Sequence, residues 1–342
     1  MHASAGHRHP LARAWRIWLV LAVVALIAFV VALSIGSTSI APLDVLHALL
    51  SQGDSTNVEV VRQLRLPRAL AAFATGGLLA VAGALMQVLL RNPLADPYVL
   101  GVSGGAAAGA LGTMLLGAGS LLIDAGAFAG AMVSIAIVFG FARSDLASAD
   151  ASSAIDASPR LLLTGVILAS AWSAVITLLL TLAPEAKLRG MLFWLMGDLA
   201  GVDQYGWALI ALPIVAFVAF AVARDCNVLL RGPVIARSLG VQVGKLRIAL
   251  YFLASMATAL AVTTAGAVGF IGLVIPHAIR LVVGNDQRVL IPASALAGGA
   301  LLLIADTAAR TLLSPQQLPV GVLTTMIGAP AFMLLLMRRG TR

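Results

Sequence analysis

The stretch RIALYFLASMATALAVTTAGAVGFIGLVIPHAIR, residues 247–280, has no Asp, Glu, Lys or Arg between its two terminal arginines. It is too long for one helix across a hydrocarbon core of ~30 Å, and too short for two full helices at ~1.5 Å per residue. Glycine and proline inside a membrane free backbone groups that only neighbouring protein or water can satisfy. Such breaks occur here at Gly266, Gly269, Gly272 and Pro276. The stretch therefore predicts a full membrane helix followed by a short, protein-enclosed helix that returns.

The rest of the chain has the same apolar character. Of its 342 residues, 61% are hydrophobic and 11% are charged, and the mean hydropathy is +1.02. These values exclude a soluble protein and indicate an all-α polytopic membrane protein. Runs without Asp, Glu, Lys or Arg predict about ten transmembrane helices in one domain, 1–342, near residues 17–36, 69–90, 98–119, 125–142, 161–183, 204–223, 248–266, 270–284, 289–305 and 319–337.

The basic residues indicate the orientation. With both termini in the cytoplasm, the 22 Lys and Arg residues lie in cytoplasmic segments except Arg62, Arg65, Arg68, Lys187, Arg189 and Arg310. Such a bias is typical of an inner-membrane protein. The longer cytoplasmic segments are then 1–16, 143–160 and 226–247. Segment 143–160 is a Ser/Ala/Asp-rich loop that is predicted to be flexible. The basic residues behind the net charge of +8 thus set the orientation of the chain in the lipid membrane. No nucleic-acid partner is therefore expected.

The segment RGPVIARSLGVQVGKLR, residues 231–247, carries five basic residues and no acid. Part of it looks like a phosphate-binding loop, but Leu239 stands where the first glycine is needed and Leu246 replaces the hydroxyl residue. The chain therefore does not bind ATP by this device. Its single cysteine, Cys226, excludes an intrachain disulfide.

The acidic residues do not favour an ion-coupled carrier, which needs ionisable groups near the middle of the membrane. Asp96, Asp124, Asp198 and Asp306 fall near predicted helix ends, and His277 lies alone in the short broken helix, where a structural role is favoured. Energy is then expected from a partner protein. An ion-coupled secondary transporter of a small solute stays open as the alternative.

Five motifs in order along the chain give a family resemblance. They are LRLPRALAAFATGGLLAVAGALMQVLLRNPLADPYVLGVSGGA (64–106), FWLMGDLAGVD (193–203), ARSLGV (236–241), GFIGLVIPHAIRL (269–281) and LPVGVLTTMIGAPAFMLLL (318–336). Together they resemble the FecCD-type permease subunits of bacterial ABC importers for vitamin B12, haem and ferric siderophores. One departure is Gln317, where many relatives carry Glu before Leu-Pro.

The resemblance implies the type II permease fold of ABC importers and a role in transport rather than catalysis. The implied partners are a second permease subunit, identical or a sister chain, two ATPase subunits and a periplasmic binding protein. ATP and Mg would be bound by the partner ATPase, and no catalytic residue, metal or cofactor belongs to this chain. The resemblance leaves corrinoid, haem and siderophore open as cargo.

The resemblance also implies three groups of site residues. A coupling segment that contacts the ATPase comprises Arg231, Ala236, Arg237, Ser238, Leu239 and Gly240; its alternative is a basic loop that only enforces topology. Binding-protein docking is assigned to Arg65, Arg68 and Arg310, because a planar guanidinium can hold a carboxylate through two hydrogen bonds; alternatively they reach lipid headgroups or cap helices. The translocation pathway would pass Thr164, Ser170, Ser173 and Thr177, whose hydroxyls could equally bond their own helix backbone.

Overall fold

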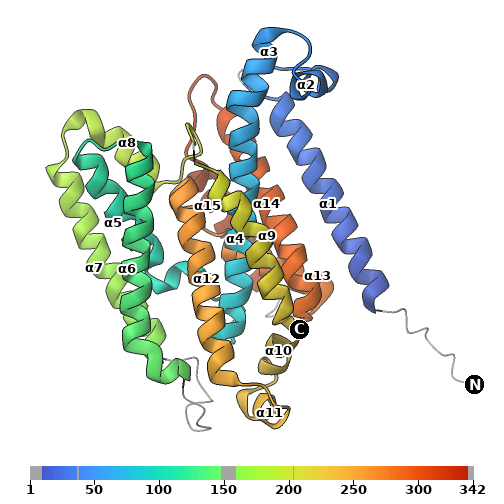
Figure 1. The fold of residues 1–342 in the computed structure, drawn as a ribbon, viewed down its shortest axis with the longest axis vertical. Coiled ribbons are helices and arrows are strands. Elements are labelled where there is room, and N and C mark those ends of the chain that lie inside the picture. The colour runs from blue at the N-terminus through green and yellow to red at the C-terminus, as the bar shows by residue number, and fades with distance from the viewer. Residues whose placement is uncertain (1–9, 37, 148–158, 203, 338–342) are drawn as a thin grey trace, which may run out of the picture.

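The computed structural model describes residues 10–36, 38–147, 159–202 and 204–337, and within these ranges the chain is helical without strands (Figure 1). The ten predicted helices correspond to α1 (Pro10–Ser34), α4 (Leu66–Leu89), α5 (Val102–Leu115), α6 (Ser120–Ala147), α7 (Pro159–Leu182), α9 (Gly206–Ala221), α12 (Val243–Ala265), α13 (Ile271–Val283), α14 (Gln287–Thr311) and α15 (Val320–Met337). Short elements join them: α2 (Pro42–Leu49), α3 (Ser55–Glu59), the π-helical turn η1 (Val60–Arg65), the 3-10 turn η2 (Pro97–Leu100), α8 (Glu185–Leu195), α10 (Ala223–Leu229) and α11 (Pro233–Ser238).

The all-α membrane fold predicted from the sequence is confirmed. In the described ranges, six helices are long and apolar enough to cross a membrane, and α9 with α10, bent by 53° at the break between them, is a seventh candidate if the pair is one span. The shorter apolar helices are α5, α13 and α15. A short α13 after a full-length α12 is the broken pair that the glycines of residues 247–280 predict.

The helices run between two ends of the molecule (Figure 1). Trp18 Nε1 donates a hydrogen bond to the carbonyl oxygen of Val289 at 3.2 Å, near the starts of α1 and α14. Arg310 Nη2 donates to the carbonyl oxygen of Ala32 at 2.8 Å, near the other ends of the same helices. We call the end with α10 and α11 the α11 end, and the end with α2, α3 and α8 the arginine end.

Helix α4 forms the centre of the fold, and α9, α12, α13 and α14 pack around it. Its residues from Thr75 to Val88 are all buried. Small residues allow this close packing: a Cβ atom at Gly76 would collide with the carbonyl oxygen of Gly298 in α14, and one at Gly83 with that of Gly272 in α13. Helices α4 and α14 therefore pack backbone against backbone.

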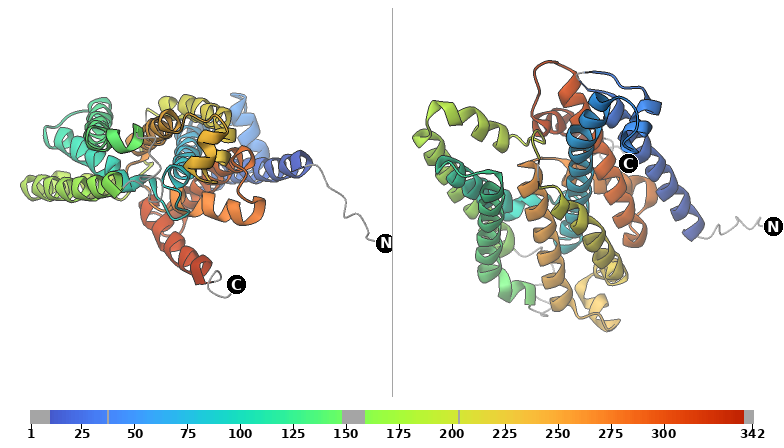
Figure 2. Two further views of the ribbon diagram at one scale, coloured as in Figure 1. Left: turned by 90° about the horizontal axis from the view of Figure 1, so that it is seen from below. Right: turned by 45° about the horizontal axis from the view of Figure 1, so that its top comes forward.

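A second group of helices, α5 to α8, lies to one side of this centre (Figure 2). Helices α5 and α6 meet through glycines, because a Cβ at Gly109 would collide with the carbonyl oxygen of Gly126. Lys187 of α8 donates to the carbonyl oxygen of Leu115 at 2.9 Å and so satisfies a carbonyl at the end of α5. In the most apolar stretch of α7, only 17% of the residues are buried in the single chain.

Several predicted boundaries are wrong: α1 begins at Pro10 rather than 17, and α12 at Val243 rather than 248. The second predicted helix begins at Ser55 rather than 69, because η1 and α4 continue α3 without interruption. The π-helical turn ends two residues before Pro67, whose missing N–H prevents a normal helical hydrogen bond. Helix α14 runs to Thr311 instead of 305, and α6 to Ala147 instead of 142. Residues 1–9 of the predicted cytoplasmic segment 1–16, residues 148–158 of the predicted loop 143–160 and residues 338–342 lie outside the described residues.

Candidate functional site

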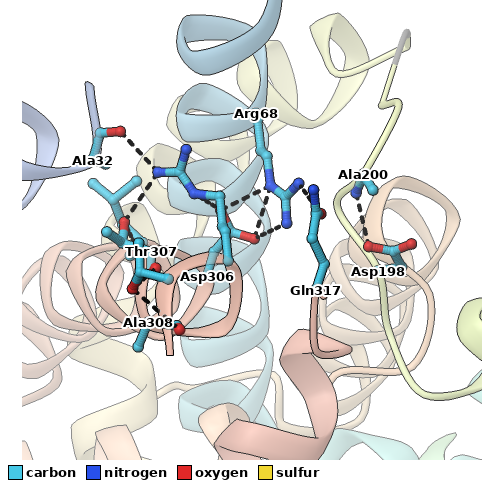
Figure 3. Close-up of polar contacts among 11 residues, drawn as sticks. Ala32, Arg68, Asp198, Ala200, Asp306, Thr307, Ala308 and Gln317 are labelled. Atoms are coloured by element: carbon cyan, nitrogen blue, oxygen red, sulfur yellow. Dashed lines mark hydrogen bonds and ion pairs between the residues drawn. The ribbon is translucent and has the colours of Figure 1, made fainter. Parts of the chain in front are cut away.

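Arg68 and Asp306 form a buried ion pair at the arginine end (Figure 3). Arg68 Nε lies 3.0 Å from both carboxylate oxygens of Asp306, and Nη2 lies 2.8 Å from Oδ1. The Asp306 side chain is 1% exposed and that of Arg68 is 12% exposed. Arg68 Nη1 also donates to Gln317 Oε1 at 2.9 Å. The ion pair joins α4 to α14, and the bond to Gln317 joins α4 to the segment before α15.

Arg310 and Arg65 lie beside this pair. Arg310 Nε is 3.5 Å from Asp306 Oδ2, one helical turn away, and Nη2 bonds the carbonyl oxygen of Ala32. Arg65 is buried, and its Nη1 donates to the carbonyl oxygens of Leu33 and Ser34 at 2.7 and 2.9 Å. These contacts help to satisfy carbonyl groups at the end of α1, which lack helical partners; the Ser34 carbonyl also accepts from the backbone N–H of Ile40 at 2.9 Å.

The structure thus brings together the three arginines that the sequence assigned to docking, and each makes contacts inside the chain. Arg62, one turn before Arg65, has an exposed side chain and hydrogen-bonds the hydroxyl of Ser51. We call Arg65, Arg68, Arg310 and Asp306 the arginine cluster.

The sequence did not assign a role to Asp306, which places a carboxylate between two guanidinium groups. A usable signal was present: in an otherwise uncharged run, Asp306 and Arg310 are four residues apart, the spacing at which helical side chains meet. Because the helix was predicted to end at 305, Asp306 and Arg310 were not placed on the same helix. Asp198, in the loop after α8, lies close to the cluster (Figure 3), and burial raises its pKa above the usual range.

At the α11 end, the predicted coupling segment folds into α11 and the turns on either side of it. Pro233 occupies the first turn of α11, which suits its fixed φ, and Gly240 ends the turn after it with a φ of +84°. Ala236 is fully buried, whereas the Leu239 side chain is 66% exposed. Ser238 and Arg237 bond carbonyls of their own helix, at Val234 and Pro233.

A groove lies between this segment and the start of α12. Its volume is about 410 Å³, and its lining includes Asp225, Leu239, Gly240 and Lys245. Both signs of charge thus border an exposed leucine. Such a surface can accept both an apolar and a charged side chain of a partner.

The four hydroxyl residues assigned to the pathway lie on α7 as expected. Ser170 donates to the carbonyl oxygen of Val166 at 3.1 Å, and Thr177 donates to that of Ser173 at 2.9 Å. For these two residues the hydroxyl does bond its own helix, as the alternative interpretation proposed. Ser170, Ser173 and Thr177 are exposed in the single chain, while Thr164 is half-buried.

The break between α12 and α13 is held by Tyr98 of η2. Its hydroxyl donates to the carbonyl oxygen of Val268 at 2.9 Å and accepts from the Val268 N–H at 3.0 Å. Gly266 and Phe270 both adopt positive φ angles, 68° and 69°, on either side of Val268. The freed backbone of the broken helix is therefore satisfied by protein. His277 is buried in α13, with its ring 5.9 Å from that of Phe332 in an edge-on arrangement.

No group of three or more His, Cys, Asp or Glu residues in the described parts of the chain is arranged to hold a metal ion.

Comparisons with known proteins give the relatives of this chain. Residues 24–338 match the FecCD transport family. The vitamin B12 import system permease protein BtuC of Escherichia coli O127:H6 (strain E2348/69 / EPEC) is 41% identical over 284 residues, which is 82% of this chain and 84% of that protein.

Two solved structures share the fold. A transporter described as an ABC transporter of the metal-chelate type, in an inward-facing conformation, superposes with a TM-score of 0.80 at 29% identity over 94% of this chain and 99% of its own. PsaBC from Streptococcus pneumoniae, in complex with Fab, gives a TM-score of 0.54 at 16% identity over 81% and 93%, which supports the fold alone.

Proposed function

The chain belongs to the FecCD transport family, and from this premise we propose that it is the permease subunit of a binding-protein-dependent ABC importer for a metal chelate. It is a membrane transport subunit and not an enzyme. The first candidate cargo is a corrinoid of the vitamin B12 type. The observation that carries this choice is the 41% identity to a vitamin B12 permease over 82% of the chain.

Energy would enter at the α11 end. In the proposed complex, α11 and Leu239 sit in a cleft of a partner ATPase, which binds ATP and Mg. Support comes from the exposed Leu239 beside the charged groove of Asp225 and Lys245. The buried Ala236 anchors the same short helix to the bundle. A movement of the ATPase would therefore displace α11 together with the helices beneath it.

Cargo would be delivered at the arginine end by a periplasmic binding protein with acidic surface residues. The arginine cluster contains three guanidinium groups and one carboxylate, and Asp306 pairs with Arg68 and Arg310. The excess positive charge would attract an acidic partner and orient it. Arg62 presents a further guanidinium at the same end.

A second permease subunit would cover part of the apolar surface of α7 and α15, and the cargo would pass between the subunits. In the single chain these helices expose large apolar side chains, among them Ile167, Leu178, Met326 and Met333. In this arrangement the α11 end faces the cytoplasm of a bacterium and the arginine end faces the periplasm. The excess of Lys and Arg assigned to the α11 side supports that orientation.

Uptake into proteoliposomes tests the proposal. The chain is reconstituted with a partner ATPase and a periplasmic binding protein from the same bacterium, and uptake of cyanocobalamin, ferrichrome and haemin is measured separately. We expect cyanocobalamin uptake that requires both ATP and the binding protein. Uptake that follows a proton or sodium gradient without ATP would support the alternative secondary transporter. ATP-dependent uptake of another chelate would retain the importer and replace the cargo.

A further inference from the structure

Asn227 of α10 is bonded to the first turn of α14 through both ends of its amide group. Its Nδ2 donates to Asp286 Oδ1 at 2.8 Å, and its Oδ1 accepts from the backbone N–H of Gln287 at 2.8 Å. Asp286 in turn accepts from the backbone N–H of Arg288 at 3.0 Å and so caps the helix. We call Asn227, Asp286 and Gln287 the α10–α14 joint.

The joint connects the segment that carries α11 to a long helix of the bundle. Only Leu230, Arg231 and Gly232 separate α10 from α11, and the backbone N–H groups of Arg231 and Gly232 bond carbonyls of α10. The first N–H groups of a helix have no partner within the helix. Asn227 supplies that partner for Gln287, a fully buried residue. A displacement of α10 therefore acts directly on the start of α14.

The far end of the same helix carries Asp306 and Arg310 of the arginine cluster. From Asp286 to Asp306 the chain advances about 30 Å at ~1.5 Å per residue. Between these ends α14 packs backbone to backbone on α4 at Gly76 and Gly298, and a Cβ at Gly299 would collide with Phe73. Pro292 lies in the second turn, before this packed region. Arg68 of α4 then bonds Asp306 at the arginine end.

We infer that α14, bonded to α10 through the α10–α14 joint, is the element that links the ATPase contact at α11 to the arginine cluster, with Asn227 as a positioning residue. This inference rests on the proposed function. Binding of a loaded binding protein at the arginine end would bias the position of α14 and so of α10 and α11. The same coupling must act in both directions, because linkage between two sites is reciprocal.

A double-mutant cycle tests the joint without leaving a cavity. In N227D, a second carboxylate faces Asp286, and like charges at hydrogen-bond distance separate the two side chains. In N227D/D286N, the amide and the carboxylate exchange places, so that both hydrogen bonds can form again. D286N alone keeps an oxygen that can accept from Asn227. The matched control is R288A, because Arg288 bonds Asp286 from the exposed side, whereas the bonds of Asn227 go to Asp286 and Gln287.

The measurement is the ratio of ATP hydrolysis with the cyanocobalamin-loaded binding protein to hydrolysis without it, in reconstituted complexes of equal subunit content. We expect N227D to lower this ratio by about fivefold or more, the lower range of allosteric coupling. The double variant should restore it, and R288A should leave it unchanged. Because the cycle compares variants of matched volume, recovery in the double variant also excludes simple misfolding of the chain.

An unchanged ratio in N227D would overturn the inference, and so would a loss that persists in a double variant that still assembles. Failure of the proposed function gives a different result: the wild-type complex would then take up cargo without ATP. A wild-type complex that couples ATP to uptake, together with an insensitive N227D, rejects only the role of α14.

Discussion

Arg68 donates three hydrogen bonds of 2.8–3.0 Å to Asp306, a residue 238 positions later in the chain. The pair ties the central helix α4 to α14 at the arginine end. Asp306 is almost fully enclosed and also lies 3.5 Å from Arg310. The carboxylate of Asp306 therefore balances much of the positive charge of two guanidinium groups within the fold.

Asp306→Asn should destabilise the protein strongly. Removal of one partner from a buried ion pair leaves an uncompensated charge and costs ~3–5 kcal/mol. Thermal unfolding of the detergent-solubilised chain measures this effect. The control is Arg160→Ala, which breaks the ion pair between Arg160 and Asp145. The Arg160 side chain is 70% exposed, and such a surface pair contributes ~0–1 kcal/mol. Equal shifts of Tm in the two variants would contradict the account.

Arg62→Glu should slow association with the binding protein at low ionic strength and leave Tm unchanged. Arg62 is exposed beside the arginine cluster, so it can steer an acidic partner without supporting the fold. Surface-plasmon-resonance rates measure the effect, and it should shrink above ~0.5 M salt, where the screening length is a few ångström. Arg160→Glu on α7 is the control for a general change of charge. A rate reduction of the same size in both variants rejects docking at the arginine end.

Leu239→Asp should lower ATP-dependent uptake and leave the assembled dimer intact. The exposed leucine is expected to fill an apolar pocket of the ATPase, where hot-spot residues contribute at least ~2 kcal/mol, or about 30-fold in affinity. Co-purification of the ATPase and uptake are measured together. Leu116→Asp is the matched control, because Leu116 is 86% exposed at the end of α5. Wild-type uptake by the Leu239 variant would remove α11 from the coupling role.

Asp286→Asn should remove a pH-dependent part of the stability. The hydrogen bond from Arg288, with those from Asn227 and the Arg288 N–H, lowers the pKa of Asp286 to about 2. Because the folded pKa lies below the unfolded value of ~3.9, the stabilisation is present above pH ~4 and is lost as the pH falls through about 2. Unfolding by denaturant at pH 7, 4 and 2.5 measures the difference from wild type. A difference that stays constant across this range contradicts the assignment.

The membrane helices and the break in residues 247–280 could be predicted because each depends on local composition. Charge-free runs mark helices, and Gly266 and the other glycines mark the break. Helix boundaries were less predictable. The arginines of residues 62–68 suggested that the second helix begins after them, whereas the helix begins at Ser55 and continues through the π-helical turn and Pro67.

The arginine cluster could be predicted only in part. Positive charge on the disfavoured side selected Arg65, Arg68 and Arg310, but nothing in the sequence indicates that Asp306 faces Arg68, because that pairing depends on the packing of α4 against α14. The α10–α14 joint was missed for the same reason. Asn227 and Asp286 are ordinary polar residues in the sequence, and their contact depends on the packing of α10, which follows a bend of 53° after α9, against α14.

Cysteine labelling in whole cells tests the central claim, that energy enters at the α11 end on the cytoplasmic side and cargo at the arginine end on the other. Leu239→Cys and Arg62→Cys are made separately with Cys226 replaced by Ser, and each is treated with a thiol reagent that does not cross the membrane. The account predicts that Arg62→Cys reacts in intact cells, and that Leu239→Cys reacts only after the cells are opened. Labelling of Leu239→Cys in intact cells would contradict it.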